Sequence, residues 1–282
     1  MKTKNAMLLM ALVMMCRGTS FIFSKTLMNS YEPLNILAVR FITSFLILAV
    51  IFYKKIVKTN KQTFLYGCLL GFVYTACMVA EMYGLRYNDT GTSAFIENSA
   101  VVIVPVYEML LTRKLPSKTV IIAALTAFVG VGFLTVAGGA NVSLGIWLAV
   151  LAALIYGVCI LLTKYVAMDC DPISIGIWQL GSMGAYSLIL SIVLESPRLP
   201  NTKNEWIMLM MLVLVCSCFG FTFQPLAQKY ISVEIAGIFS AINPLSTCVV
   251  GILFANESMG MFKVLGGLLI ICAVLMSVKI NS

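Results

Sequence analysis

The chain has 282 residues, of which 61% are hydrophobic and only 11% are charged, and its mean hydropathy is +1.00. A soluble globular domain has about 45–50% apolar and about 25% charged residues, so this composition excludes a water-soluble fold. The net charge of +8 is spread over short connections, and no long polar stretch interrupts the apolar sequence. Nucleic-acid binding and a soluble catalytic domain are therefore not expected, and an all-α membrane protein is.

Ten apolar runs follow one another along the chain, each long enough to cross a bilayer as a helix. They cover about residues 6–28, 33–52, 63–84, 92–112, 119–137, 144–165, 173–194, 206–226, 233–255 and 261–279. The first run follows two lysines, as a signal peptide would, but more apolar runs come after it rather than a domain to be secreted. We therefore interpret it as a retained transmembrane helix.

The positive residues predict the orientation of these ten helices. With the N-terminus inside, twelve of the 19 Lys and Arg residues face the cytoplasm: Lys2, Lys4, Lys54, Lys55, Lys58, Lys61, Arg113, Lys114, Lys118, Lys164, Lys229 and Lys279. Five face the opposite side, namely Lys25, Arg86, Arg198, Lys203 and Lys263. Cytoplasmic loops carry the excess of positive charge, so we expect an inner- or plasma-membrane protein with both termini in the cytoplasm.

The two halves of the sequence are similar to each other at an offset of 139 residues. Residues 17–25 (RGTSFIFSK) align with residues 156–164 (YGVCILLTK), and the Glu-Pro pair at 32–33 aligns with the Asp-Pro pair at 171–172. Each half holds five spans, and because five is odd the second copy enters the membrane from the opposite face. The sequence thus predicts two inverted five-helix repeats, residues 1–139 and 140–282, that work by alternating access.

Several short segments of the sequence resemble those of the EamA-domain family of the drug/metabolite transporter superfamily. They are residues 18–25, the Arg40-Phe41 pair, and Asn243-Pro244 followed by Asn256-Glu257-Ser258. The resemblance implies a ten-helix carrier made of two five-helix copies. The substrates of that family range over amino acids, nucleobases, quaternary cations and sugar phosphates, so the resemblance does not choose among them.

Arg17 lies near the middle of the first apolar run, where an ionisable group costs at least about 2.5–3.5 kcal/mol. A guanidinium remains protonated there and can hold an anion through paired hydrogen bonds. We consider two roles for Arg17. It binds a negative group of the substrate, or it forms a buried ion pair with Glu97 or Glu81.

Glu97 is the deepest carboxylate of the fourth run, and its neighbour Asn98 can hydrogen-bond to either protonation state. We expect Glu97 to be the proton-coupling residue, with Glu81 as the next candidate. Gly18, Pro105 and Pro244 are predicted hinges, because glycine permits close approach and proline removes a helical hydrogen bond. The other predicted substrate-binding residues are polar or aromatic side chains within spans: Arg40, Tyr74, Glu81, Asn98, Tyr156, Trp178, Gln179, Gln224 and Asn243.

Metal, cofactor and catalytic sites are not expected in this chain. It contains nine cysteines, eight of them within apolar runs, but no histidine and no Cys-x-x-Cys pair. It also lacks a Gly-x-Ser-x-Gly motif and paired aspartates, so an intramembrane enzyme is not predicted.

We therefore expect a secondary transporter in the lipid bilayer that moves a small amphoteric or anionic metabolite, such as an amino acid or a derivative of one. An arginine together with carboxylates within the spans suits a molecule that carries both charges. Protons are the candidate coupling ion. The alternative is an exporter of cationic drugs or nucleobase-like compounds, in which Arg17 only neutralises Glu97.

Overall fold

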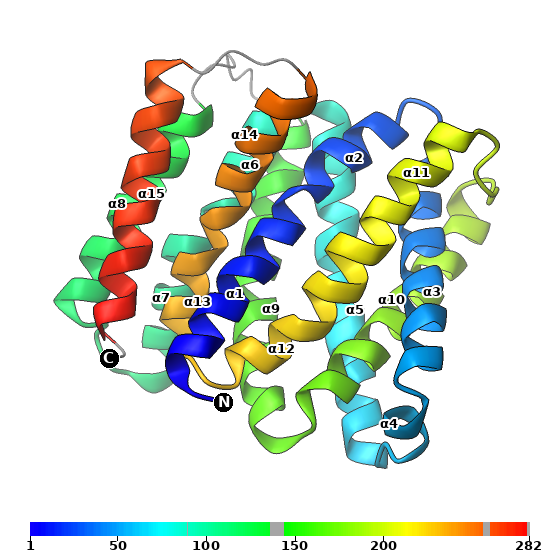
Figure 1. The fold of residues 1–282 in the computed structure, drawn as a ribbon, viewed down its shortest axis with the longest axis horizontal. Helices are drawn as coiled ribbons and strands as arrows, with labels where there is room; N and C mark the ends of the chain where they lie inside the picture. Colours follow the sequence, from blue (N-terminus) through cyan, green and yellow to red (C-terminus); the bar gives the residue numbers. More distant parts are fainter. Residues whose placement is uncertain (89, 136–143, 256–259, 281–282) are drawn as a thin grey trace.

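The computed structural model describes residues 1–88, 90–135, 144–255 and 260–280, and helices make up nearly all of this part (Figure 1). Eight helical segments within it are long and apolar enough to cross a membrane. Two further helices contribute shorter apolar stretches among the residues searched, Lys118–Phe133 and Val264–Val278. The prediction of an all-α membrane protein is confirmed. The predicted boundary at residues 139 and 140 and the segment 256–258 lie outside the described residues.

The first half of the chain contains eight helices: α1 (Thr3–Gly18), α2 (Ser20–Leu27), α3 (Pro33–Ile51), α4 (Tyr53–Val57), α5 (Lys61–Tyr87), α6 (Thr90–Asn98), α7 (Ala100–Thr112) and α8 (Lys118–Thr135). The second half contains α9 (Leu144–Asp169), α10 (Pro172–Leu194), α11 (Lys203–Met211), the π-helix η1 (Leu212–Phe221), α12 (Thr222–Gln228), α13 (Val233–Ser240), α14 (Ile242–Ala255) and α15 (Met261–Ile280).

The helices form one bundle in which segments far apart in sequence are neighbours. Helix α8 packs against α15 at one edge, and α3 and α5 both pack against α10 at the other (Figure 1). Between these edges α1 contacts η1, α12 and α14, while α9 contacts α5 and α7. The start of α1 and the end of α15 lie toward the lower end of the bundle in Figure 1.

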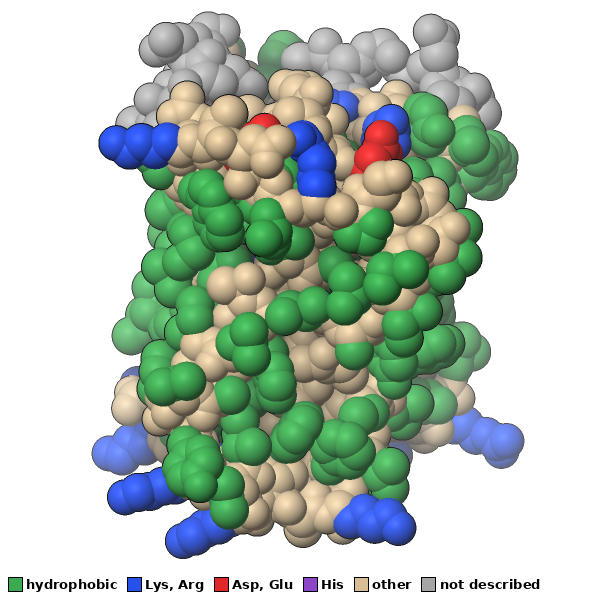
Figure 2. Space-filling view, turned by 90° about the vertical axis from the view of Figure 1, so that its right-hand side faces the viewer, with side chains coloured by type: hydrophobic (Ala, Val, Ile, Leu, Met, Phe, Trp, Pro, Cys, Tyr) green, Lys and Arg blue, Asp and Glu red, His purple; other side chains and the backbone are tan. Residues whose placement is uncertain are grey.

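The outer surface has the charge distribution of a membrane protein. Figure 2 shows apolar side chains over the middle of one face, with Lys and Arg side chains at its two ends. Large apolar side chains such as Val50, Phe72 and Ile192 are exposed by 61–80%. This exposure is unfavourable in water but not in contact with lipid tails, so the middle band matches the hydrocarbon core of a bilayer.

Three of the apolar runs are interrupted as helices near their middles. The interruptions lie at Thr19 between α1 and α2, at Ser99 between α6 and α7, and at Ala241 between α13 and α14. The sequence predicted the second break at Pro105, but Pro105 lies inside α7. A proline ring crowds the carbonyl four residues before it, here that of Val101, and the interruption at Ser99 lies two residues further toward the N-terminus.

A fourth distortion was not predicted from the sequence. Residues 212–221 form the π-helix η1, which ends at Phe221, four residues before Pro225. A wider turn at this point accommodates the proline ring, and π-helical turns are common at functional sites.

Two lysines at corresponding positions of the predicted repeats make the same kind of contact. Lys25 Nζ donates hydrogen bonds to the carbonyls of Leu85 (2.5 Å) and Asn88 (2.9 Å) at the C-terminal end of α5. Lys164 Nζ donates to the carbonyl of Lys229 (3.0 Å), directly after α12. A cation stabilises a helix C-terminus because the last carbonyl groups lack helical partners.

Candidate functional site

Arg17 lies at the centre of a polar network inside the bundle. Its side chain, from the last turn of α1, is only 7% exposed, and Nη1 donates a hydrogen bond to Gln224 Oε1 on α12. Gln224 Nε2 in turn donates to the hydroxyl of Tyr74 on α5 at 3.0 Å. The Tyr74 hydroxyl lies 3.4 Å from Thr163 Oγ1 on α9. Arg17, Tyr74 and Gln224, which were predicted separately from three spans, therefore meet at one place together with Thr163.

Three aromatic rings surround the guanidinium of Arg17. Its carbon Cζ lies 4.3 Å from the ring centroid of Phe221, 5.2 Å from that of Tyr156 and 5.8 Å from that of Tyr74. At these distances the ring faces attract a cation. The sequence predicted the two tyrosines but not Phe221, which lies in an apolar run with no polar feature to mark it.

A second arginine lies against the same phenylalanine. Arg40 of α3 is 1% exposed, and its Cζ lies 5.9 Å from the Phe221 centroid and 5.0 Å from that of Phe41. Its Nε donates to Ser217 Oγ at 2.7 Å, whereas its buried Nη1 has no hydrogen-bond partner. Arg40 therefore keeps an unused donor in the interior, which is costly for a charged group.

Two buried carboxyl groups complete the site. Glu81 of α5 is 6% exposed and Glu97 of α6 is 4% exposed, and their side chains are in hydrogen-bond contact with each other. The second oxygen of Glu97, Oε2, is buried without a partner. We call Arg17, Arg40, Glu81 and Glu97 the charged cluster.

The arginines and carboxyl groups of the charged cluster influence one another without touching. Arg17 is near enough to both carboxyl groups, and Arg40 to that of Glu81, for a favourable electrostatic interaction. The ion pairs found between described residues all lie elsewhere: Lys55 with Asp171, Arg86 with Glu32 and Arg198 with Glu205. A direct ion pair of Arg17 with Glu97 or Glu81, one of the two roles considered from the sequence, is therefore not formed in this conformation.

Asn98 and Asn243 meet at a second place, where two helix interruptions lie side by side. Asn243 Nδ2 donates to Asn98 Oδ1 at 3.5 Å, and Asn98 Nδ2 donates to the carbonyl of Ala94 at 2.7 Å. Gly18 is also here, because a Cβ atom at Gly18 would collide with the Asn243 carbonyl oxygen and lie 2.9 Å from its Cα. The predicted hinge residues Gly18 and Pro244 thus border one helix contact.

The predicted residues Trp178 and Gln179 lie apart from this network. Trp178 Nε1 donates to Thr59 Oγ1 at 3.2 Å, and its ring packs edge-on against Phe64. Gln179 is 1% exposed, its Oε1 has no partner, and its backbone carbonyl faces Gly71 of α5. None of their contacts involves Arg17, Tyr74 or Gln224.

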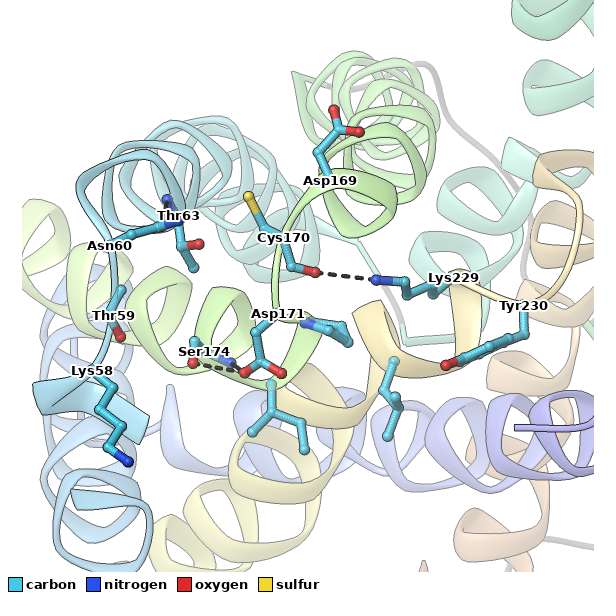
Figure 3. A pocket seen from close by; sticks show the side chains of 13 residues that line it. Lys58, Thr59, Asn60, Thr63, Asp169, Cys170, Asp171, Ser174, Lys229 and Tyr230 are labelled. Atoms are coloured by element: carbon cyan, nitrogen blue, oxygen red, sulfur yellow. Dashed lines mark hydrogen bonds between the residues drawn. The ribbon is translucent and has the colours of Figure 1, made fainter. Parts of the chain in front are cut away.

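A separate polar pocket of about 580 Å³ opens between the connections at the end of the bundle that holds the termini (Figure 3). Lys229 Nζ crosses it to donate to the Cys170 carbonyl at 3.3 Å. Asp171 caps α10 through the Ser174 amide at 2.9 Å and forms an ion pair with Lys55 at 3.0 Å. Burial acts to raise the pKa of Asp171, but hydrogen bonds from Ser174 and Lys55 outweigh it and lower that pKa.

No described part of the chain brings three or more Cys, Asp or Glu side chains together as a metal site would require. The charged cluster offers two guanidinium groups, two carboxyl groups and aromatic rings. Such a set can bind a small charged molecule and exchange a proton.

Comparisons with known proteins agree on the kind of protein this is. The sequence profile of the EamA-like transporter family matches residues 4–136 and again residues 143–279. Two proteins of Archaeoglobus fulgidus, each named "Uncharacterized transporter", are similar to the chain. One is 24% identical over 94% of this chain and 83% of its own length, and the other is 22% identical over 95% of both. A solved crystal structure with 13% sequence identity has the same fold, with a TM-score of 0.84 over 99% of each chain.

Proposed function

The chain belongs to the EamA-like transporter family and is a membrane transporter rather than an enzyme, and we propose that it moves a small anionic or amphoteric metabolite, an amino acid or a derivative of one, by alternating access. The substrate binds at the charged cluster, where Arg17 holds its negative group. Gln224 and Tyr74 orient the guanidinium, and the rings of Tyr156 and Phe221 flank it.

The observation that carries this proposal is the environment of Arg17. The guanidinium is buried, but its neighbours are a neutral amide and aromatic rings rather than a carboxylate at contact distance. A guanidinium that served only to neutralise a glutamate would be expected to touch it, because a buried ion pair offsets its desolvation only with close geometry. This environment supports a role for Arg17 in forming paired hydrogen bonds with an incoming anion.

The proposed architecture is a pair of inverted five-helix repeats, residues 1–139 and 140–282, giving ten transmembrane helices with both termini in the cytoplasm. The family profile matches each half once, which supports two copies. The contacts of Lys25 at the end of α5 and of Lys164 beyond α12 support the same correspondence. In this arrangement substrates bind between the copies, near the middle of the membrane.

The second candidate function is export of cationic drugs or nucleobase-like compounds. The burial of Glu81 and Glu97 favours it, because a carboxylate in an apolar interior can bind a cation. In that case Arg17 would serve only to hold these groups ionised.

Transport by purified protein in proteoliposomes tests the proposed function. We expect counterflow of a labelled zwitterionic or anionic metabolite, and no counterflow of a matched amine. Glu97→Gln, which removes the proposed proton carrier, should lose transport driven by a proton gradient and keep part of the counterflow, which moves no net proton. Counterflow of cations alone would establish the second candidate instead.

A further inference from the structure

The net charge of the cluster depends on how many protons its two carboxyl groups hold. Both arginines remain protonated in any protein interior. Two carboxylates in direct contact repel each other strongly, so a contact like that between Glu81 and Glu97 requires a proton between them. With one proton shared, the cluster contains two positive charges and one negative charge, and a net charge of +1 is left in a buried site.

The other charged or titratable groups near the pair do not cancel this charge. The groups that face the two carboxyl groups are the arginines already counted, Arg17 from α1 and Arg40 from α3. The only additional ones among the described residues are Cys77 from α5 and Tyr156 from α9. A thiol and a phenol are neutral near pH 7. One bound monoanion would neutralise the protonated cluster, and loss of the proton would neutralise it without an anion.

The site has four states, because the shared proton and the anion can each be bound or absent. Two of these states are neutral, namely the site with neither proton nor anion and the site that holds both. The remaining two bury a net charge, which is unfavourable in a low-dielectric interior. Resting on the anionic one of the two proposed substrate types, because a zwitterion brings no net charge, we infer that Glu81 and Glu97 take up one proton together with each substrate anion, so that the protein is a proton–anion symporter.

The positions of the unused polar atoms fit this coupling. Arg40 Nη1 and Glu97 Oε2 are both buried without partners in the conformation in which the carboxyl groups touch. When the shared proton leaves, the two carboxylates separate and become acceptors for the arginines, which then have fewer donors left for an anion. Proton and anion thus favour each other's binding, and an inward proton gradient would drive uptake.

The pH dependence of anion binding tests this inference. The probe is benzoate, which suits a guanidinium beside aromatic rings and stays ionised above about pH 6. Its Kd is measured for the purified full-length protein between about pH 6 and pH 9, with benzamide and benzylamine as neutral and cationic analogues. If one proton binds with each anion, the Kd should rise about tenfold per pH unit on the alkaline side of the titration.

Glu97→Gln fixes one member of the pair as neutral, so its Kd should no longer depend on pH and should stay near the low-pH value of the wild type. Glu108→Gln is the matched control. Glu108 accepts a hydrogen bond from Tyr165 at 3.2 Å outside the cluster, so this variant should keep the slope.

These measurements test the symport and the anionic substrate class separately. Tighter benzoate binding at higher pH, or wild-type binding that does not vary with pH, would overturn the symport and leave the anionic substrate class intact. Equal or better binding of benzylamine, or binding of none of the three compounds to folded protein, would contradict the anionic substrate class and the inference with it.

Discussion

Replacement of Arg40 by methionine separates a structural role of this residue from a functional one. The unbranched apolar side chain fills a similar volume and removes the charge, and Ser217→Ala in the same protein removes the hydroxyl that would lose its partner. The double variant gives up one charged hydrogen bond, about 1.5–3 kcal/mol, and ring contacts at 5.0 and 5.9 Å, about 0.5–2 kcal/mol each. It also removes the desolvation cost of a buried ion, which is several kcal/mol.

These contributions nearly cancel, so we expect the double variant to unfold within about 1 kcal/mol of the wild type, or to be more stable. Reversible unfolding in mixed detergent micelles measures this, while the affinity for benzoate should fall. Arg86→Met is the control, because the Arg86–Glu32 pair is exposed and should contribute less than about 1 kcal/mol. A loss of more than about 3 kcal/mol in the double variant would instead make Arg40 a structural residue.

Three further predictions concern packing, acid stability and topology. Gly18→Ala should destabilise the fold by about 1–3 kcal/mol in thermal unfolding, because the new methyl group meets the Asn243 backbone. Gly132→Ala should not destabilise it, because a methyl group there lies 3.6 Å from the Phe95 ring, an ordinary contact distance. Because the pKa of Asp171 is lowered in the folded protein, its carboxylate stabilises the fold above its unfolded pKa of about 3.9, and this contribution is lost as the pH falls further. Acidification should therefore lower the unfolding temperature of the wild type more than that of Asp171→Asn. An impermeant thiol reagent applied from outside the cell should label a single cysteine at position 201 and not one at position 58, and the reverse pattern would invert the proposed orientation.

Much of the fold could be predicted from the sequence because apolar runs of membrane length carry a strong signal. The sequence also predicts a repeat in which Lys25 and Lys164 occupy matching positions, and in the structure both lysines donate hydrogen bonds to carbonyls at the end of a distant helix. The helix breaks were harder to place. Pro105 marks a weak point because it removes a helical hydrogen bond, but the helix is interrupted at Ser99, six residues before the proline.

The site was only partly predictable for a related physical reason. Polar residues within spans are costly, so Arg17, Gln224 and Glu97 could be identified from the sequence alone. Phe221 could not, because an aromatic residue in an apolar run has no distinguishing feature until α1 and η1 pack together. Gln179 was predicted as a polar side chain within a span, yet its side chain donates to Met183 Sδ on its own helix and does not reach the network around Arg17.

The preference of the binding site for a negative charge tests most directly whether Arg17 recognises the substrate. Binding of benzoate and of benzamide is measured for the wild type, Arg17→Gln and Arg17→Lys. We expect the wild type to prefer the acid, and both variants to lose that preference by on the order of 2 kcal/mol, because neither side chain reproduces the paired donors of a guanidinium. An equal preference for the acid in wild type and Arg17→Gln would contradict the central claim that Arg17 recognises the substrate.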